Sequence, residues 1–307
     1  MPEHDKWSRW LLETRFGGDE KAAAGALNFL TKVRDRLLDK GGLADGKTVL
    51  DVGAGDGLIA FGAVERVGPT GRVIISDVSE PLLDRAREVA DQLGVLSRCT
   101  FIKARADDLS AIESESVDLV TTRSVLIYVD DKLSAFKEFF RVLKPGARTA
   151  LFEPIDDRRM KEDSAFWQRM AWGAPGAERE QADELMKRLL KYFEEHLHVN
   201  EAMVNFNERD LLRWCIEAGF AGVHTEFDLD AGPRPPMRWE TMLNMVANPL
   251  VPSMAEIMQE IFSDEERARV ERYLRPQVER GGDPMRRQGS YTWAFKAPIP
   301  EDPWGRN

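Results

Sequence analysis

Cysteine and long apolar runs are both scarce in this chain. Only Cys99 and Cys215 occur among 307 residues, far apart and in no metal-ligand spacing, so the sequence contains no disulfide framework. No window approaches the roughly 18 uninterrupted apolar residues that a membrane span requires. The charged start MPEHDKWSRW also lacks the apolar stretch of a signal peptide. We therefore expect a cytoplasmic protein without a membrane partner.

An excess of positive charge is missing as well. Lysine and arginine total 43 against 53 acidic residues, which gives a formal net charge of −10. Proteins that bind nucleic acid usually carry a basic surface, because neutralising phosphates drives their affinity. This balance argues against a nucleic-acid partner and for small or cationic ligands. The sequence shows no internal repeats and leaves the oligomeric state open.

Strand and helix patterns alternate regularly from Thr48 to Ile155. Short apolar runs that suit buried strands are separated by single amphipathic helices, an order that predicts right-handed βαβ units. Strands are expected at 48–53, 71–78, 99–104, 116–125 and 147–155, with two more at 222–230 and 290–298. The prediction is an α/β fold with a doubly wound, mostly parallel, seven-stranded sheet.

Helical segments flank and interrupt this pattern, and they suggest a division of the chain. Expected helices at 6–16 and 22–40 would form an N-terminal cap, and charged segments rich in Met, Trp and Phe would form two helical insertions. The parts are a cap (1–42), a core (43–155), a first insertion (156–205), a continuation of the core (206–230), a second insertion (231–289), and the last strand with the tail (290–307).

A glycine-rich loop follows the first expected strand. Gly53, Gly55 and Gly57 alternate directly after the apolar run TVLDV, where residues without a Cβ permit unusual dihedrals and a close approach of ligand to backbone. Dinucleotide-binding loops have the pattern G-x-G-x-x-G, which would require a glycine at Leu58. The third glycine here comes one position too early.

The charges of this loop also disfavour a dinucleotide. Asp51 ends the strand and Asp56 lies at the start of the helix, where a carboxylate would repel a pyrophosphate. Two carboxylates suit a ligand that carries an ammonium and a sulfonium group. We therefore do not expect NAD or a flavin dinucleotide.

The motif VLDVGAGDG resembles the first motif of class I S-adenosylmethionine-dependent methyltransferases. The resemblance continues through IISD, FIKARADDL, DLVTTRSVLIYV and RVLKPGARTALFEP, with weaker agreement at LLRWCIEAGF, and covers roughly residues 45–155. It implies a Rossmann-like methyltransferase fold with helical lid insertions, S-adenosylmethionine as cofactor and S-adenosylhomocysteine as product.

The resemblance also implies the reaction, which is methyl transfer to an O, N or C nucleophile of a small molecule. Two alternatives remain on the same fold. One is an RNA or protein methyltransferase, which the acidic composition disfavours. The other is a non-methylating protein that binds S-adenosylmethionine, since a shared fold does not fix function.

Several cofactor contacts follow from the resemblance. The Asp51 carboxylate would hold the α-ammonium group, Asp77 would accept hydrogen bonds from both ribose hydroxyls, and Val78 would border the adenine. An arginine of the N-terminal helix, Arg15, would meet the methionine carboxylate. The backbone that passes under the methionine moiety would be that of Gly53, Ala54 and Gly55.

The third motif departs from the family pattern. Relatives usually place an acid there, which binds the adenine amino group, followed by a small residue; this chain has Arg105 and Ala106. A guanidinium cannot accept a hydrogen bond from an amino group. Either the Ala106 backbone acts alone, with Arg105 turned toward solvent or Asp108, or Asp107 takes over.

Two residues at the end of the fourth expected strand complete the cofactor candidates. Arg123 and Ser124 would lie under the sulfonium, at the edge where open α/β sheets hold ligands. A helix N-cap is an equally good interpretation of Ser124.

No catalytic triad is evident, and none is needed, because a sulfonium is already an excellent leaving group. Glu153, at the end of the fifth core strand, is the best-placed candidate base or substrate-orienting acid. The spacing of His196 and His198 does not suit a metal pair on a helix, and no acidic cluster indicates a magnesium site, so we expect no metal. The four histidines, His4, His196, His198 and His224, are the remaining candidate bases.

Overall fold

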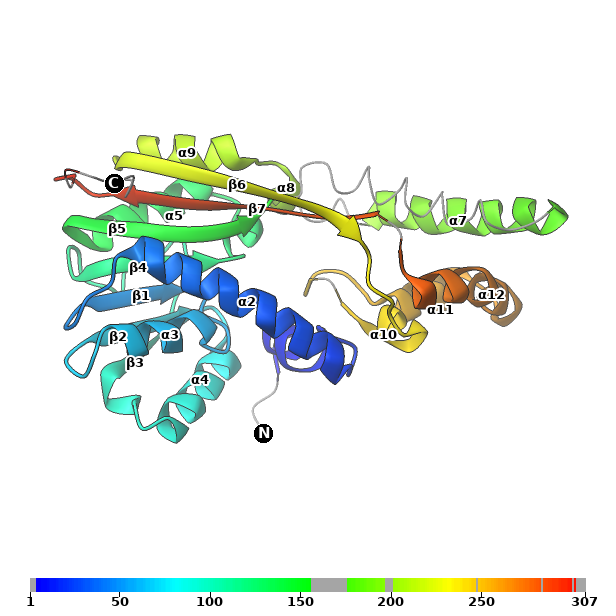
Figure 1. Cartoon of the computed structure of the whole chain (residues 1–307), viewed down its shortest axis with the longest axis horizontal. Coiled ribbons are helices and arrows are strands. Elements are labelled where there is room, and N and C mark those ends of the chain that lie inside the picture. Colours follow the sequence, from blue (N-terminus) through cyan, green and yellow to red (C-terminus); the bar gives the residue numbers. More distant parts are fainter. Residues whose placement is uncertain are drawn as a thin grey trace.

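One seven-stranded sheet forms the centre of the molecule (Figure 1). The computed structural model describes residues 4–155, 176–196, 201–246, 248–282, 284–299 and 301. The strand order is β3-β2-β1-β4-β5-β7-β6; the first five strands along this order are parallel, and β7 runs antiparallel to both β5 and β6. The predicted fold class is confirmed. The strands are β1 Thr48–Val52, β2 Arg72–Asp77, β3 Cys99–Lys103, β4 Val117–Arg123, β5 Leu143–Pro154, β6 Ala221–Pro233 and β7 Pro284–Phe295.

Helices cover both faces of the sheet and bury two separate cores. One core joins α2, α3 and α4 to the sheet through side chains such as Leu37, Ile59 and Leu83. The other joins α5 and α9 to the opposite face through Phe136 and Leu211. The helices are α2 Glu20–Gly41, α3 Leu58–Arg66, α4 Glu80–Gln92, α5 Lys132–Val142 and α9 Glu208–Glu217, with a short 3₁₀ turn at Leu96–Arg98.

Strands β6 and β7 form a ribbon that extends well beyond the rest of the sheet (Figure 1). Their pairing continues as far as Pro233 opposite Pro284, so the strands predicted at 222–230 and 290–298 were too short. Residues 231–233 and 284–289, which we had placed in the second helical insertion, are strand. Sequence periodicity missed them because PMRRQG has no apolar alternation, whereas cross-strand pairing stabilises the extended backbone.

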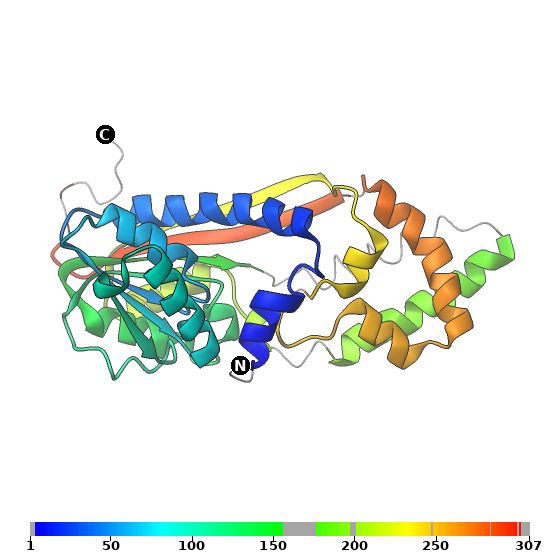
Figure 2. The same cartoon turned by 90° about the horizontal axis from the view of Figure 1, so that it is seen from below.

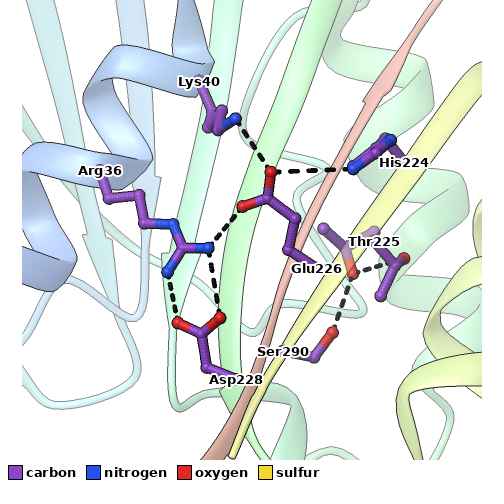
Figure 3. A network of polar contacts seen from close by, with 8 residues as sticks. Arg36, Lys40, His224, Thr225, Glu226, Asp228 and Ser290 are labelled. Carbon is purple, nitrogen blue, oxygen red and sulfur yellow. Dashed lines mark hydrogen bonds and ion pairs between the residues drawn. The ribbon is translucent and has the colours of Figure 1, made fainter. Parts of the chain in front are cut away.

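Helix α2 lies along the ribbon and is bound to it by charged groups (Figure 3). The Arg36 guanidinium donates hydrogen bonds to Asp228 and Glu226, and Lys40 Nζ lies 3.1 Å from Glu226 Oε1. The guanidinium also lies 3.8 Å from the ring centroid of Tyr291 on β7. These contacts connect α2 to the last two strands of the sheet.

The ribbon leads to a group of helices that has its own core. Trp239, Leu189, Val270 and Leu274 are buried there, away from the sheet. The helices of this group are α7 Gly176–His196, α10 Trp239–Asn244, α11 Met254–Ile261 and α12 Asp264–Arg280. None of the helices in the described ranges has the length and apolarity to cross a membrane.

The N-terminal segment lies between the sheet and α10–α11 (Figure 2). A single helix was predicted at 6–16, but the structure has a short α1, Lys6–Arg9, followed by a π-helical turn, η1, Trp10–Thr14. The Arg15 N–H donates to the Trp10 carbonyl at 2.8 Å. That five-residue spacing is the π pattern. Such turns are rare in proteins, and those that occur are often found at functional sites.

Candidate functional site

A cavity of about 810 Å³ opens at the carboxyl ends of β1, β2 and β4. This edge is where open α/β sheets bind ligands, and the volume lies in the upper part of the roughly 300–1,000 Å³ range of small-molecule sites. Its walls come from the loops after these strands, the N-terminal segment, and residues of α8 (Glu201–Val204), α10 and α11.

The glycine loop after β1 presents bare backbone to the cavity. Gly53 has a φ of +64°, and a Cβ there would stand 2.3 Å from Val125 Cγ2. At Gly55, with a φ of +59°, a Cβ would stand 3.0 Å from Leu11 Cδ2. Ala54 completes the lining, and its N–H donates to the Ser76 carbonyl at 3.0 Å, which binds the loop to β2.

Asp77 ends β2 and faces the cavity together with Val78. Its carboxylate accepts hydrogen bonds from the Gly55 N–H at 2.8 Å and the Ser79 N–H at 2.9 Å. Burial raises the pKa of this carboxyl group, and the two backbone hydrogen bonds oppose that shift. Because a carboxylate has about four acceptor sites, Asp77 retains capacity for two further donors.

Asp51, which the resemblance assigns to the ammonium group directly or through water, does not itself line the cavity. It is 1% exposed, and its carboxylate accepts from the Thr121 hydroxyl at 2.9 Å and the Ala60 N–H at 3.0 Å. Burial raises its pKa to about 7. Its strand position turns the side chain beneath the loop, toward α3. Asp56, which the sequence placed in the loop without assigning a contact, lines the cavity instead.

The third motif brings Arg105, Ala106 and Asp107 to the cavity together. Arg105 forms a two-bond ion pair with Asp107, with Nε–Oδ1 at 2.8 Å and Nη2–Oδ2 at 2.9 Å. We had considered solvent or Asp108 for the Arg105 side chain. It is 65% exposed to solvent and pairs with Asp107 rather than Asp108, because a planar guanidinium matches both oxygens of one carboxylate.

Arg123 and Ser124 both line the cavity at the end of β4. Ser124 has a φ of +56°, outside the extended region typical of an N-cap, and the 3₁₀ turn η3, Leu126–Tyr128, begins after Val125. The N-cap interpretation was therefore wrong. Burial lowers the pKa of Arg123, while Asp56 and Asp51 oppose that shift.

Arg15 extends from the N-terminal segment into the same cavity. Its guanidinium carbon lies 5.0 Å from the ring centroid of Trp10 and 5.1 Å from that of Phe16. Burial, followed by repulsion from Arg123, lowers the pKa of Arg15 to about 10, whereas Asp56 raises it. Two cationic groups, one from the N-terminal segment and one from the end of the central strand β4, thus meet at one site.

Glu153 is buried beneath the cavity and does not line it, so it is badly placed to act as a base. It is 0% exposed. Its carboxylate accepts from the backbone N–H groups of Val125 at 3.0 Å, Leu126 at 3.1 Å and Ile127 at 3.3 Å. Burial raises its pKa to about 7. Glu153 fixes the loop after β4.

The two histidines whose side chains are described do not supply a base at the cavity either. His4 pairs with Glu13, and His224 packs on Trp293 with centroids 4.3 Å apart; neither lines the cavity. The His196 side chain and His198 lie outside the described residues. Within the described ranges, no group of three or more His, Cys, Asp and Glu residues could hold a metal ion.

Apolar residues that we had not assigned to the site form the rest of the cavity. The Met and Trp residues of 237–258 belong to the second helical insertion that the sequence predicted. The structure divides them, because Trp239 and Met258 are core whereas several methionines face the cavity. Sequence periodicity cannot make this distinction. The unassigned apolar lining includes Trp7, Trp10, Leu11, Tyr128, Met203, Met242, Met245, Met254 and Ile257.

Comparison with known proteins identifies the domain. Residues 43–198 match the family model of a methyltransferase domain. Ubiquinone/menaquinone biosynthesis C-methyltransferases of Enterobacter sp. strain 638 and Escherichia coli K12 are 34% identical to this chain over 132 residues, 42% of this chain and 52% of theirs. The chain therefore spans about half the length of the curated relatives it matches.

Solved structures share the fold. A Bacillus halodurans protein described as a methyltransferase superposes with a TM-score of 0.53 at 19% identity, covering 86% of this chain and 98% of the other. YcgJ from Bacillus subtilis gives a TM-score of 0.50 at 14% identity, covering 89% and 98%.

The sheet, the glycine loop and the acid after β2 define a Rossmann-like protein with a ligand site at the carboxyl edge. Together with the family match, they show that the chain belongs to the class I S-adenosylmethionine-dependent methyltransferases.

Proposed function

We propose that this protein transfers a methyl group from S-adenosylmethionine to an O, N or C nucleophile of a small apolar molecule. The observation that carries the proposal is that one cavity has two chemically different halves. The cofactor half contains the glycine loop, Asp56 and Asp77, and the acceptor half contains Met203, Met242, Met245, Met254 and Ile257.

The cofactor half fits S-adenosylmethionine in shape and charge. The loop of Gly53–Gly55 permits close approach of the methionine moiety, and Asp77 has acceptor capacity for the ribose hydroxyls. Asp56 would face the cationic groups, and Arg15 the methionine carboxylate. When bound, the sulfonium supplies an activated methyl group.

The chain's own task is to align the acceptor and exclude water. Among the described residues that line the cavity there is no histidine, and Glu153 is occupied by three backbone N–H groups. The acceptor therefore provides its own lone pair or anion. The apolar walls hold it in line with the methyl group and the sulfur, and alignment of this kind can supply much of the acceleration.

A quinol-type ring, methylated at carbon, is the most specific acceptor that we propose. The names of the curated relatives support a quinone pathway. The methionine-rich half supports a ring, since thioethers adapt their shape and contact aromatic edges favourably. RNA or a protein would need a polar binding surface, whereas the described residues that line this half are mainly apolar.

Calorimetry with S-adenosylhomocysteine and NAD tests the cofactor assignment; we expect micromolar binding of the first and none of the second. Transfer of labelled methyl from S-adenosylmethionine is then measured to quinols and other apolar ring compounds, with primary amines, peptides and RNA as comparison. Binding of NAD alone would overturn the cofactor assignment. Exclusive methylation of RNA or peptide would overturn the small-molecule acceptor.

A further inference from the structure

The N-terminal segment, residues 4–19, contacts the cofactor half of the cavity. Leu11 lies over the glycine loop, with its Cδ2 3.0 Å from where a Cβ of Gly55 would stand. Trp7 packs edge-on against Tyr128, with ring centroids 4.9 Å apart. A ligand on the glycine loop would therefore be covered by this segment.

The same segment is hydrogen-bonded to the acceptor half. Trp10 Nε1–H donates to the Val246 carbonyl at 2.8 Å, and the Val246 N–H donates to the Thr14 carbonyl at 3.2 Å. The Thr241 hydroxyl donates to the Asp19 carboxylate. These bonds end on α10 and the residues just after it, which carry Met242 and Met245 of the cavity wall.

Gly17 shows how closely the two parts are packed. A Cβ at this position would lie 2.9 Å from the Met245 nitrogen and 3.1 Å from the Thr241 oxygen, both of which are backbone atoms. Gly17 and Gly18 share a left-handed backbone, with φ of +55° and +73°, but a Cβ on Gly18 would meet nothing within 4 Å. The close contact with α10 therefore requires a glycine at position 17 but not at position 18.

We propose that Trp10 and Gly17 are positioning residues that couple cofactor binding to the geometry of the acceptor wall. This inference rests on the proposed function. A cofactor that orders the segment through Leu11 and Arg15 also orders α10, because the segment is bonded to both halves. The coupling is reciprocal, so an acceptor that fixes α10 strengthens cofactor binding by the same factor.

Hydrogen exchange measured by mass spectrometry, with and without S-adenosylhomocysteine, tests the coupling without an acceptor. In the wild type we expect the ligand to slow amide exchange in residues 239–246 by about fivefold or more. Gly17→Ala should bind the ligand but lose this protection. Gly18→Ala is the matched control, with equal backbone strain and no contact, and should keep the protection. Trp10→Phe, which removes the N–H donor and keeps a smaller aromatic ring, should lose part of it.

The outcomes separate this inference from the proposed function. A wild type that does not bind S-adenosylhomocysteine contradicts the proposed function. A wild type that binds it without protection of 239–246, or a Gly17→Ala variant that retains full protection, overturns the coupling. Loss of binding in Gly17→Ala but not in Gly18→Ala supports it, because a Cβ at Gly17 would meet backbone atoms of Thr241 and Met245 on the acceptor side. If Gly17→Ala does not fold, as thermal unfolding will show, Trp10→Phe decides.

Discussion

Arg105 and Asp107 pair through two hydrogen bonds on the loop that follows β3, and both residues line the cavity. The family's usual acid is replaced here by an arginine that engages the acid two positions later. Each Asp107 oxygen keeps a second acceptor site, so the ion pair leaves Asp107 able to bind the adenine amino group.

Asp107→Ala should weaken S-adenosylhomocysteine binding about tenfold, since a hydrogen bond to a charged acceptor contributes about 1.5–3 kcal/mol. Arg105→Ala should change the affinity by less than about threefold, because a guanidinium offers the amino group no acceptor. Calorimetry on both variants, with thermal unfolding as the folding check, decides the matter. Strong loss from Arg105→Ala without loss from Asp107→Ala would show that stacking of the guanidinium on the adenine matters more.

Asp77→Ala should weaken cofactor binding by at least about tenfold, because two hydrogen bonds to a charged acceptor are lost. Asp77 also binds the Gly55 and Ser79 N–H groups, so the loop itself could be disturbed. A 2′-deoxy analogue of S-adenosylhomocysteine separates the two effects. If Asp77 binds the ribose, the variant should discriminate less between the analogue and the parent ligand. Asp91→Ala, an exposed acid on α4, is the control.

The stability of the protein should fall as the pH rises from about 4.5 to about 7. Burial raises the pKa of Asp51 and of Glu153 to about 7, from 3.8 and 4.5. The folded state therefore binds more protons than the unfolded state in this window. The stabilisation from these two protonated carboxyl groups is complete below their pKa values in the unfolded chain, and it is lost as the pH rises through their folded-state pKa of about 7.

Asp51→Asn provides the test, because the amide does not ionise. Its oxygen can still accept from the Ala60 N–H, and its N–H can donate to the oxygen of the Thr121 hydroxyl, which in the wild type donates to the carboxylate. We expect the free energy of unfolding, measured in urea, to fall between pH 5 and pH 7. The fall should be about 2–3 kcal/mol smaller in this variant than in the wild type. An unchanged pH dependence would mean that Asp51 ionises in the folded state near its usual pKa.

Arg36→Ala should lower the free energy of unfolding by about 1–2 kcal/mol, since it removes an ion-pair network and a stacked ring contact. Glu226 and Asp228 would then face each other without Arg36 (Figure 3). Arg36→Lys should recover only part of the lost stability, because a lysine lacks the planar guanidinium that donates to two carboxylates at once. Urea denaturation is the measurement, with Lys21→Ala on the exposed first turn of α2 as control. Equal effects of Arg36→Ala and Lys21→Ala would contradict the network.

The order of strands and helices, the glycine loop and the acid after β2 were all readable in the sequence. Each depends on neighbouring residues: apolar runs make buried strands, and glycines at 53, 55 and 57 reach the positive φ values that the loop adopts. For the same reason the chain's family was recognisable from short motifs in the correct order.

Tertiary structure alone decided which side chains face the cavity. Asp51 in β1 and Asp56 in the loop after it are only five positions apart, yet burial beneath α3 takes the first away from the cavity and leaves the second in it. The length of the β6–β7 ribbon and the contact of Gly17 with α10 join residues more than 40 positions apart. Local propensity carries no information about such long-range pairing, because the partner atoms are brought together only when the whole chain folds.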